Sequence, residues 1–360
     1  MDDFKTRSGL CRRDFQQTID GKQTDLYVLT NGNGGELAIT NYGCALLTWL
    51  TPDKEGRMGN ILQGHDSIQH LVDSDVDCLS TTIGRYGNRI CDGRFTLDGT
   101  TYQLACNNGK NSLHGGPRGF HRRVWTVIGQ SANSVKLQYT AQDGEEGFPG
   151  TVTVTLTYTL LDDHALRMDY EATTDKKTII NLTNHAFFSL SGIGNPTPSQ
   201  MDDIVTINAD FYLPTDETNI PTGEILKVAG TPMDFRTPHA IGERIDEPHE
   251  QLKCGHGYDH CYVLNKTEAG DLTQAATCTD PASGRTLEVY TTEPGVQFYT
   301  ANWNHGMKGA FGSTYPDRSA VCFEAQHFPD TPNRSYFPTA VLCPGHTYRQ
   351  TTIYQIKVKH

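Results

Sequence analysis

Residues 151–160, TVTVTLTYTL, decide the fold class of this chain. Every even position in the stretch is apolar and every odd position is threonine, which is the period-2 pattern of a strand with one buried and one wet face. A turn over 161–163 follows, and the apolar residues at 166, 168, 170 and 172 then alternate with polar ones. The two runs predict a long antiparallel hairpin.

The same alternation recurs at 135–139, 286–290 and 354–358, and short turns with Gly, Asp or Asn separate the runs. Only residues 65–72 suggest a helix. Many strands and few helices predict an all-β fold, a sandwich or a barrel. Residues 208–257 are rich in Pro, Gly, Thr and Asp and show no sustained alternation. Because the strand patterns on both sides are alike, we interpret this stretch as a long functional loop within one domain of residues 1–360.

Composition excludes several classes of partner. The formal net charge of -12 lacks the basic footprint that nucleic-acid binding requires. No stretch approaches the roughly 18 apolar residues of a membrane-spanning helix. The first residues, MDDFKTRSGLCRRDF, contain no apolar core of a secretory signal, which predicts a cytoplasmic protein. The 10 cysteines form no CxxC pair, so we interpret them as reduced structural thiols.

Four short motifs contain residues that could bind or transform a polar ligand. They are GRYGNRI at 84–90 with Asn88 and Arg89, NSLHGG at 111–116 with His114, NLTNHAFFSL at 181–190 with Asn184 and His185, and VCFEAQHFPD at 321–330 with Glu324. Each also has an ordinary structural interpretation, such as a surface turn, a polar network or a buried salt bridge. Glu324 follows an apolar run, which predicts that it lies at the end of a buried strand, where desolvation raises its pKa.

Taken together and in this order, the motifs resemble those of the aldose 1-epimerase (galactose mutarotase) family. DGEEGFPG at 143–150, GTPMDF at 230–235, GYDH at 257–260 and GVQFY at 295–299 extend the resemblance over essentially the whole chain. It implies a large antiparallel β-supersandwich of the galactose mutarotase type with one sugar-binding cleft. By this resemblance Glu324 is similar to the general base, His185 to the general acid and His114 to the second active-site histidine.

The resemblance also implies a set of residues that hold the sugar hydroxyls. These are Asn88, Arg89, Asn184, Asp259 and Gln297. Two positions depart from the family pattern, with Phe187 where Tyr is usual and Ser189 where Asn is usual. Aromatic residues in sugar sites stack on the apolar face of the ring, and the candidates here are Phe187, Phe188, Phe298, Tyr299 and Trp303.

Interconversion of sugar anomers needs a base for the anomeric hydroxyl and an acid for the ring oxygen, and it needs neither a covalent nucleophile nor a cofactor. We therefore expect a small aldose such as galactose or glucose as the ligand and no catalytic metal. A structural cation such as calcium, held by loop carboxylates, is compatible with the sequence. Both a monomer and a homodimer are compatible with it as well.

Four other functions are weighed against this one. A metal hydrolase would use His114, His185, His260 and Glu324, but these residues lack the short spacing of a ligand motif. A glycoside hydrolase would pair Glu324 with Asp259 as its two carboxylates. A sugar-phosphate 1-epimerase would need cationic groups beyond Arg85 and Arg89. A carbohydrate-binding module without catalysis would tolerate the loss of Glu324 or His185.

Overall fold

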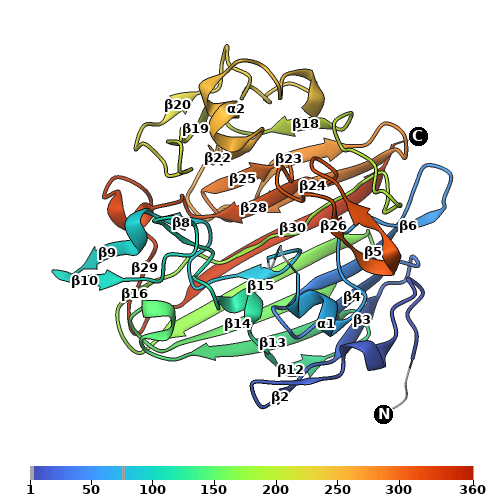
Figure 1. Ribbon diagram of the computed structural model, residues 1–360, viewed down its shortest axis with the longest axis horizontal. Coiled ribbons are helices and arrows are strands. Elements are labelled where there is room, and N and C mark those ends of the chain that lie inside the picture. Colours follow the sequence, from blue (N-terminus) through green and yellow to red (C-terminus); the bar gives the residue numbers. More distant parts are fainter. Residues whose placement is uncertain (1–3, 75, 77, 360) are drawn as a thin grey trace.

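Three antiparallel sheets dominate the computed structural model, which describes residues 4–74, 76 and 78–359 (Figure 1). In the described residues the largest sheet has nine strands. Their order is β12 (Thr126–Gln130), β13 (Ser134–Ala141), β14 (Val152–Leu160), β15 (Ala165–Thr174), β30 (Tyr348–Val358), β24 (Arg285–Thr291), β23 (Thr273–Thr279), β18 (Ile204–Ile207) and β21 (His239–Ala240). The predicted hairpin is confirmed as β14 and β15, which pair from Val152 with Thr174 to Leu160 with Leu166.

Two smaller sheets complete the framework of the described chain. The five-stranded sheet has the order β20 (Leu226–Lys227), β19 (Phe211–Tyr212), β22 (Asp259–Val263), β25 (Gly295–Tyr299) and β28 (Cys322–Gln326). The four-stranded sheet has the order β3 (Leu26–Thr30), β4 (Glu36–Thr40), β5 (Leu46–Pro52) and β6 (Met58–Asn60). Figure 1 shows β22, β25 and β28 beside the long strands of the largest sheet.

Short strand pairs and helices connect these sheets. The pairs are β1 (Thr18–Ile19) with β2 (Lys22–Gln23), β7 (Thr82–Ile83) with β17 (Thr183–Asn184), β8 (Arg89–Ile90) with β11 (Ser112–Leu113), β9 (Arg94–Leu97) with β10 (Thr100–Gln103), β16 (Thr178–Ile179) with β29 (Val341–Leu342) and β26 (Met307–Lys308) with β27 (Thr314–Tyr315). The helices are α1 (Ile68–Val72), α2 (Glu250–Gly255) and the 3-10 turns η1 (Arg12–Phe15), η2 (Cys91–Gly93), η3 (Phe120–Arg122), η4 (Glu145–Gly147), η5 (Ile241–Glu243), η6 (Ala310–Gly312) and η7 (Thr331–Asn333). Among the described residues, none of these helices has the length and apolarity to cross a membrane.

The five-stranded sheet packs on the largest sheet through one large hydrophobic cluster. Phe323 of β28 and Tyr354 of β30 are both fully buried in this cluster, and the Tyr354 hydroxyl donates to the Phe323 carbonyl at 2.8 Å. Since side chains alternate along a strand, Phe323 on the core face leaves Glu324 on the opposite face of β28. The all-β fold predicted from the strand pattern and the antiparallel supersandwich implied by the resemblance are both confirmed. The packing of the sheets decides which way Glu324 points.

Two predictions about local structure need correction. The helix expected over 65–72 begins only at Ile68, because the Ser67 side chain caps it by accepting a hydrogen bond from the His70 N–H. Residues 208–257 are not a continuous loop, because they contain β19, β20, β21, η5 and α2. The strands in this stretch have two residues each, which is too short to produce a period in the sequence.

Candidate active site

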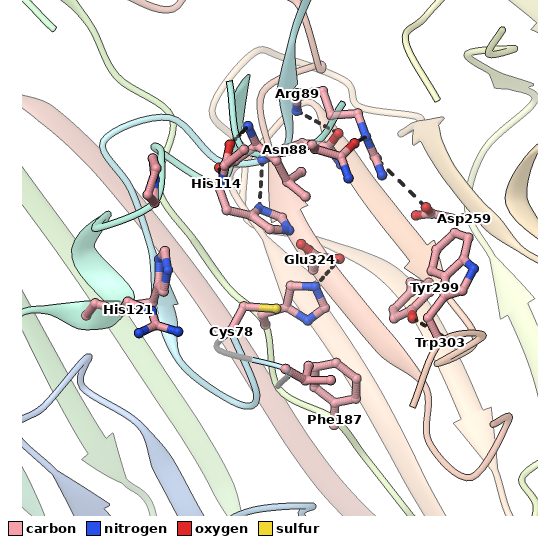
Figure 2. Close-up of a pocket in the computed structure, with 17 residues that line it drawn as sticks. Cys78, Asn88, Arg89, His114, His121, Phe187, Asp259, Tyr299, Trp303 and Glu324 are labelled. Carbon is pink, nitrogen blue, oxygen red and sulfur yellow. Dashed lines mark hydrogen bonds and ion pairs between the residues drawn. The ribbon is translucent and has the colours of Figure 1, made fainter. Parts of the chain in front are cut away.

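A cavity of about 650 Å³ lies over the face of the five-stranded sheet that carries Glu324 (Figure 2). Six of the eight residues that the sequence suggested for the site line this cavity, although they come from segments far apart in the chain. They are Asn88, Arg89, His114, His185, Asp259 and Glu324. The structure therefore brings together most of the residues implied by the resemblance.

Glu324 and His185 lie side by side in the cavity. The His185 Nε2 atom is 3.5 Å from Glu324 Oε1, and both side chains are almost completely buried. Glu324 is the central residue of β28 and not its end, which corrects the position expected from the sequence. Within the described chain, Glu324 Oε2 is a buried atom without a hydrogen-bond partner.

The backbone around His185 is held on both sides. Its N–H donates to the Thr81 carbonyl at 2.9 Å, and its own carbonyl accepts from the Ser80 N–H at 3.1 Å. The Phe187 ring stacks on the imidazole with ring centroids 4.8 Å apart and planes 12° apart. Because the backbone and one ring face are fixed, the imidazole is oriented before any ligand binds.

The surroundings of Glu324 favour its protonated form more than water does. Burial raises the pKa of Glu324 well above its usual range, the negative charge of Asp259 raises it further, and Arg89 opposes both. Burial also raises the pKa of Asp259, against the lowering effects of Arg89 and of a hydrogen bond from Gln297. A carboxyl group perturbed in this way is suited to exchange a proton with a sugar hydroxyl.

His114 is held by Asn88 through two hydrogen bonds. The His114 N–H donates to the Asn88 carbonyl at 3.1 Å, and the Asn88 N–H donates to His114 Nδ1 at 3.2 Å. Since Nδ1 accepts, the neutral ring carries its proton on Nε2 and can donate it to a ligand. Gly115 follows in the left-handed region, and a Cβ there would lie 2.1 Å from the Gly84 carbonyl oxygen. Glycine at this position thus allows the backbone of Gly84 to approach closely.

Arg89 and Asp259 lie next to each other in the cavity wall, with 3.9 Å between Nη1 and Oδ2. Arg89 Nε donates to Asn108 Oδ1 at 3.0 Å, which leaves the rest of the guanidinium directed toward Asp259. Gln297 Nε2 donates to Asp259 Oδ1 at 2.7 Å. Gln297 therefore lies behind Asp259 and supports that carboxylate, while Asp259 itself lines the cavity.

Asn184 takes a place different from the one implied by the resemblance. It is buried behind the cavity, and its Nδ2 donates to the Tyr158 hydroxyl at 3.1 Å. Ser189 is also buried, and its hydroxyl donates to the Ser319 carbonyl. Both residues belong to a structural polar network, which is the ordinary interpretation considered for this motif.

The aromatic candidates divide into two groups. Phe187, Tyr299 and Trp303 line the cavity, and the last two stack with ring centroids 5.7 Å apart and planes 21° apart. Phe188 and Phe298 lie in the hydrophobic core instead. The cavity thus has a polar side and an aromatic side, which is the division that a pyranose ring requires.

Several residues mentioned for the alternative functions do not reach the cavity. The Arg85 guanidinium donates to the carbonyls of Pro149 and Gly150, so it is used in the structure. His260 is buried outside the lining set, and its Nδ1 accepts from the Asp259 N–H at 3.2 Å. The ligand set expected for a metal hydrolase is therefore not assembled, because His260 is separated from the other three residues.

Sequence reasoning missed other residues that line the cavity. Asn107, Asn108, His121 and Arg122 are among them, as is Cys78. The interpretation of all cysteines as structural thiols is corrected for Cys78, which is partly exposed at the cavity, although all 10 cysteines are free of disulfides. A cysteine without a spaced partner gives no signal in the sequence.

Comparisons with known proteins agree with this fold. The family model described as aldose 1-epimerase matches residues 25–355. The galactose mutarotase of Sus scrofa is 41% identical over 321 residues, covering 89% of this chain and 90% of the relative. The aldose 1-epimerase of Escherichia coli is 35% identical over 339 residues, covering 93% of this chain and 96% of the relative.

Solved structures lead to the same family. An aldose epimerase homologue from C. elegans superposes with a TM-score of 0.85 at 27% identity, covering 94% of this chain and 100% of the other. A galactose 1-epimerase from Lactobacillus acidophilus gives a TM-score of 0.81 at 26% identity, covering 96% of this chain and 97% of the other. The fold and these relatives identify a carbohydrate isomerase. Among such isomerases, this chain belongs to the aldose 1-epimerase family.

Proposed function

We propose that the protein interconverts the α and β anomers of free aldoses by opening and closing the sugar ring in the cavity described above. One observation carries this proposal, namely that Glu324 and His185 face the same cavity with 3.5 Å between Oε1 and Nε2. A carboxylate and an imidazole so placed can act at the same time on two oxygens bonded to one anomeric carbon. Family membership supports the same reaction.

In the proposed reaction, Glu324 removes the proton of the anomeric hydroxyl while His185 donates a proton to the ring oxygen. The bond between the anomeric carbon and the ring oxygen breaks, and an open-chain aldehyde forms. Rotation about the bond next to the aldehyde exposes its other face. Ring closure then runs with the two roles exchanged, so that both residues recover their original protonation states.

Other cavity residues position the sugar in this proposal. The Arg89 guanidinium and His114 Nε2–H donate hydrogen bonds to hydroxyls, and the Asp259 carboxylate accepts them. Tyr299 and Trp303 cover the apolar face of the ring. Fixed donors and acceptors of this kind lower the entropy cost of bringing the acid and the base to the reacting atoms.

The proposed chemistry needs no metal or organic cofactor, because both proton transfers use side chains of the chain itself. We expect full activity after exhaustive treatment with a chelator. We also propose that the protein works in the cytoplasm as a monomer or a homodimer, in keeping with its free thiols. Light scattering during size-exclusion chromatography distinguishes the two assembly states.

The decisive experiment follows the optical rotation of freshly dissolved single anomers of galactose, glucose and xylose. The wild-type protein should speed relaxation to equilibrium, and Glu324→Gln should remove about 10²–10⁴-fold of that acceleration, the range supplied by general acid–base catalysis. Because the amide is nearly isosteric and removes a buried charge, the variant should remain folded by circular dichroism. Glu288→Gln is the matched control, since this carboxylate lies on β24 outside the cavity and forms an ion pair with Lys357 of β30.

Two outcomes would contradict the proposal. One is a folded Glu324→Gln variant whose activity stays within a few-fold of the wild type. The other is a wild-type protein that binds the sugars without changing their relaxation rate, which is the behaviour of a binding module. Release of reducing sugar from an aryl glycoside would indicate instead that Glu324 and Asp259 work as a hydrolytic pair.

A further inference from the structure

The sugar cavity contains a cluster of metal-ligating atoms that the proposed reaction does not use as such. The Cys78 sulfur and one ring nitrogen from each of His114 and His185 lie within 4.8 Å of one another. Figure 2 shows the Cys78 sulfur directed toward the interior of the cavity, below His114. We infer that Cys78, His114 and His185 form a binding site for a thiophilic divalent cation such as Zn²⁺, which competes with the sugar.

The backbone places the three side chains together. The loop that carries Cys78 leads into β7, which pairs with β17 immediately before His185. Thr81 connects the two sides, because its N–H donates to the Cys78 carbonyl at 3.2 Å and its carbonyl accepts from the His185 N–H at 2.9 Å. His114 meets His185 edge to face, with ring centroids 5.2 Å apart. The turn from Cys78 to Thr81 and the pairing of β7 with β17 therefore hold Cys78 next to His185.

The types of donor atom determine which cation fits. Thiolate sulfur and imidazole nitrogen are the ligands of zinc, whereas magnesium and calcium prefer oxygen. With bonds of about 2.0–2.3 Å, ligand atoms around a tetrahedral zinc ion lie roughly 3.5 Å apart. Each pair in this cluster must therefore approach by little more than about 1 Å, which side-chain rotation into the open cavity allows.

Glu324 lies beside this cluster without being one of its three members. Its Oε1 is 3.5 Å from His185 Nε2, which is the spacing of two ligands around one zinc ion. The fourth position of the zinc tetrahedron can be occupied by this carboxylate or by a water molecule that the sugar would displace. A Cys78 thiolate and the Glu324 carboxylate together balance the two positive charges of the cation.

Binding of the cation changes the state of His114. Its Nδ1 accepts a hydrogen bond from the Asn88 N–H, so in the neutral ring the proton resides on Nε2. Ligation through Nε2 moves that proton to Nδ1 and breaks the bond from Asn88. The cation thus occupies the two histidines that are proposed to serve the sugar, so inhibition should be competitive. This inhibitory consequence rests on the proposed function, whereas the cation site itself does not.

The site is tested first by spectroscopy on the full-length protein after chelator treatment. Titration with Co²⁺ should produce a thiolate-to-cobalt charge-transfer band in the wild type, and Cys78→Ser should abolish it. Cys106→Ser is the matched control, because this cysteine is the exposed one and does not line the cavity. Identical cobalt spectra for the wild type and Cys78→Ser would overturn the proposal.

Zinc competition provides the second readout. Zinc should displace Co²⁺ from the wild type and should raise the apparent KM for the aldose. Loss of the Cys78 ligand should weaken zinc at least about tenfold, since even loss of an outer partner of a metal ligand costs about 10–100-fold. A Cys78-dependent cobalt band in a protein without epimerase activity would refute only the proposed function. Epimerase activity without any such band would refute only the cation site.

Discussion

Asp259→Asn should move the acidic limb of the pH–rate profile toward lower pH. Catalysis in the proposed direction requires ionised Glu324, and kcat/KM therefore rises with pH through the pKa of this residue in the free enzyme. Burial is the main cause of the raised pKa of Glu324, and the charge of Asp259 is the next. Removing that charge lowers the pKa of Glu324, so that the base ionises at lower pH.

The strand spacing gives the size of this effect. Asp259 on β22 and Glu324 on β28 are separated by one strand, β25, and their partners on it, Tyr299 and Gln297, are two residues apart. At about 4.8 Å between strands and about 3.4 Å per residue, the two backbone positions lie about 12 Å apart, and this separation serves as the distance between the charges. With an effective dielectric constant of about 20, two charges at that distance repel by about 1.4 kcal/mol. The acidic limb should therefore move by about one pH unit.

The assay measures kcat/KM for one galactose anomer across the pH range by polarimetry. Loss of a hydroxyl contact from Asp259 lowers the whole profile, but only the change in charge displaces its acidic limb. Glu171→Gln, an exposed partner of Arg349, changes the net charge equally and should leave the limb in place. An acidic limb that stays fixed in Asp259→Asn, or that moves toward higher pH, would refute the electrostatic reasoning.

Two further substitutions test the framework around the site. Gly115→Ala should destabilise the fold by about 1–3 kcal/mol, because the new Cβ would collide with the Gly84 carbonyl. The collision should also displace His114 and so raise KM. Thermal melts measure the first effect and steady-state kinetics the second. Burial opposes the charged form of His327, but the Glu293 carboxylate outweighs burial and raises the pKa of this histidine. The resulting stabilisation is present below the ordinary histidine pKa of about 6.5 and is lost as the pH rises through the folded-state value. Urea unfolding should therefore show that His327→Gln is most damaging at about pH 6, and a deficit that grows with pH would contradict this assignment.

The strand pattern was predictable from the sequence, but the partners of each strand were not. Alternation in 151–160 directly reports which side chains are buried, and the hairpin with 165–174 follows from the short turn between the strands. Nothing in the alternation at 354–358 indicates that β30 pairs with both β15 and β24. A period of two identifies the two faces of a strand, whereas pairing depends on contacts between distant segments.

Site residues that belong to sequence motifs were predicted well. Site residues that stand alone in the sequence were predicted poorly. Glu324, His185 and His114 belong to ordered motifs, and the structure collects all three in one cavity. Gln297 lies directly opposite Glu324 in the sheet, yet it bonds to Asp259 instead of lining the cavity. Cys78 was missed, because its closeness to His185 arises from the pairing of β7 with β17.

The last long strand of the chain occupies the middle of the largest sheet, between two partners synthesised well before it. A growing polypeptide on the ribosome therefore carries two open edges until residues 348–358 emerge, and such edges invite association between nascent chains. Because these final pairings join distant parts of the sequence, we expect slow folding and a particular intolerance of C-terminal truncation.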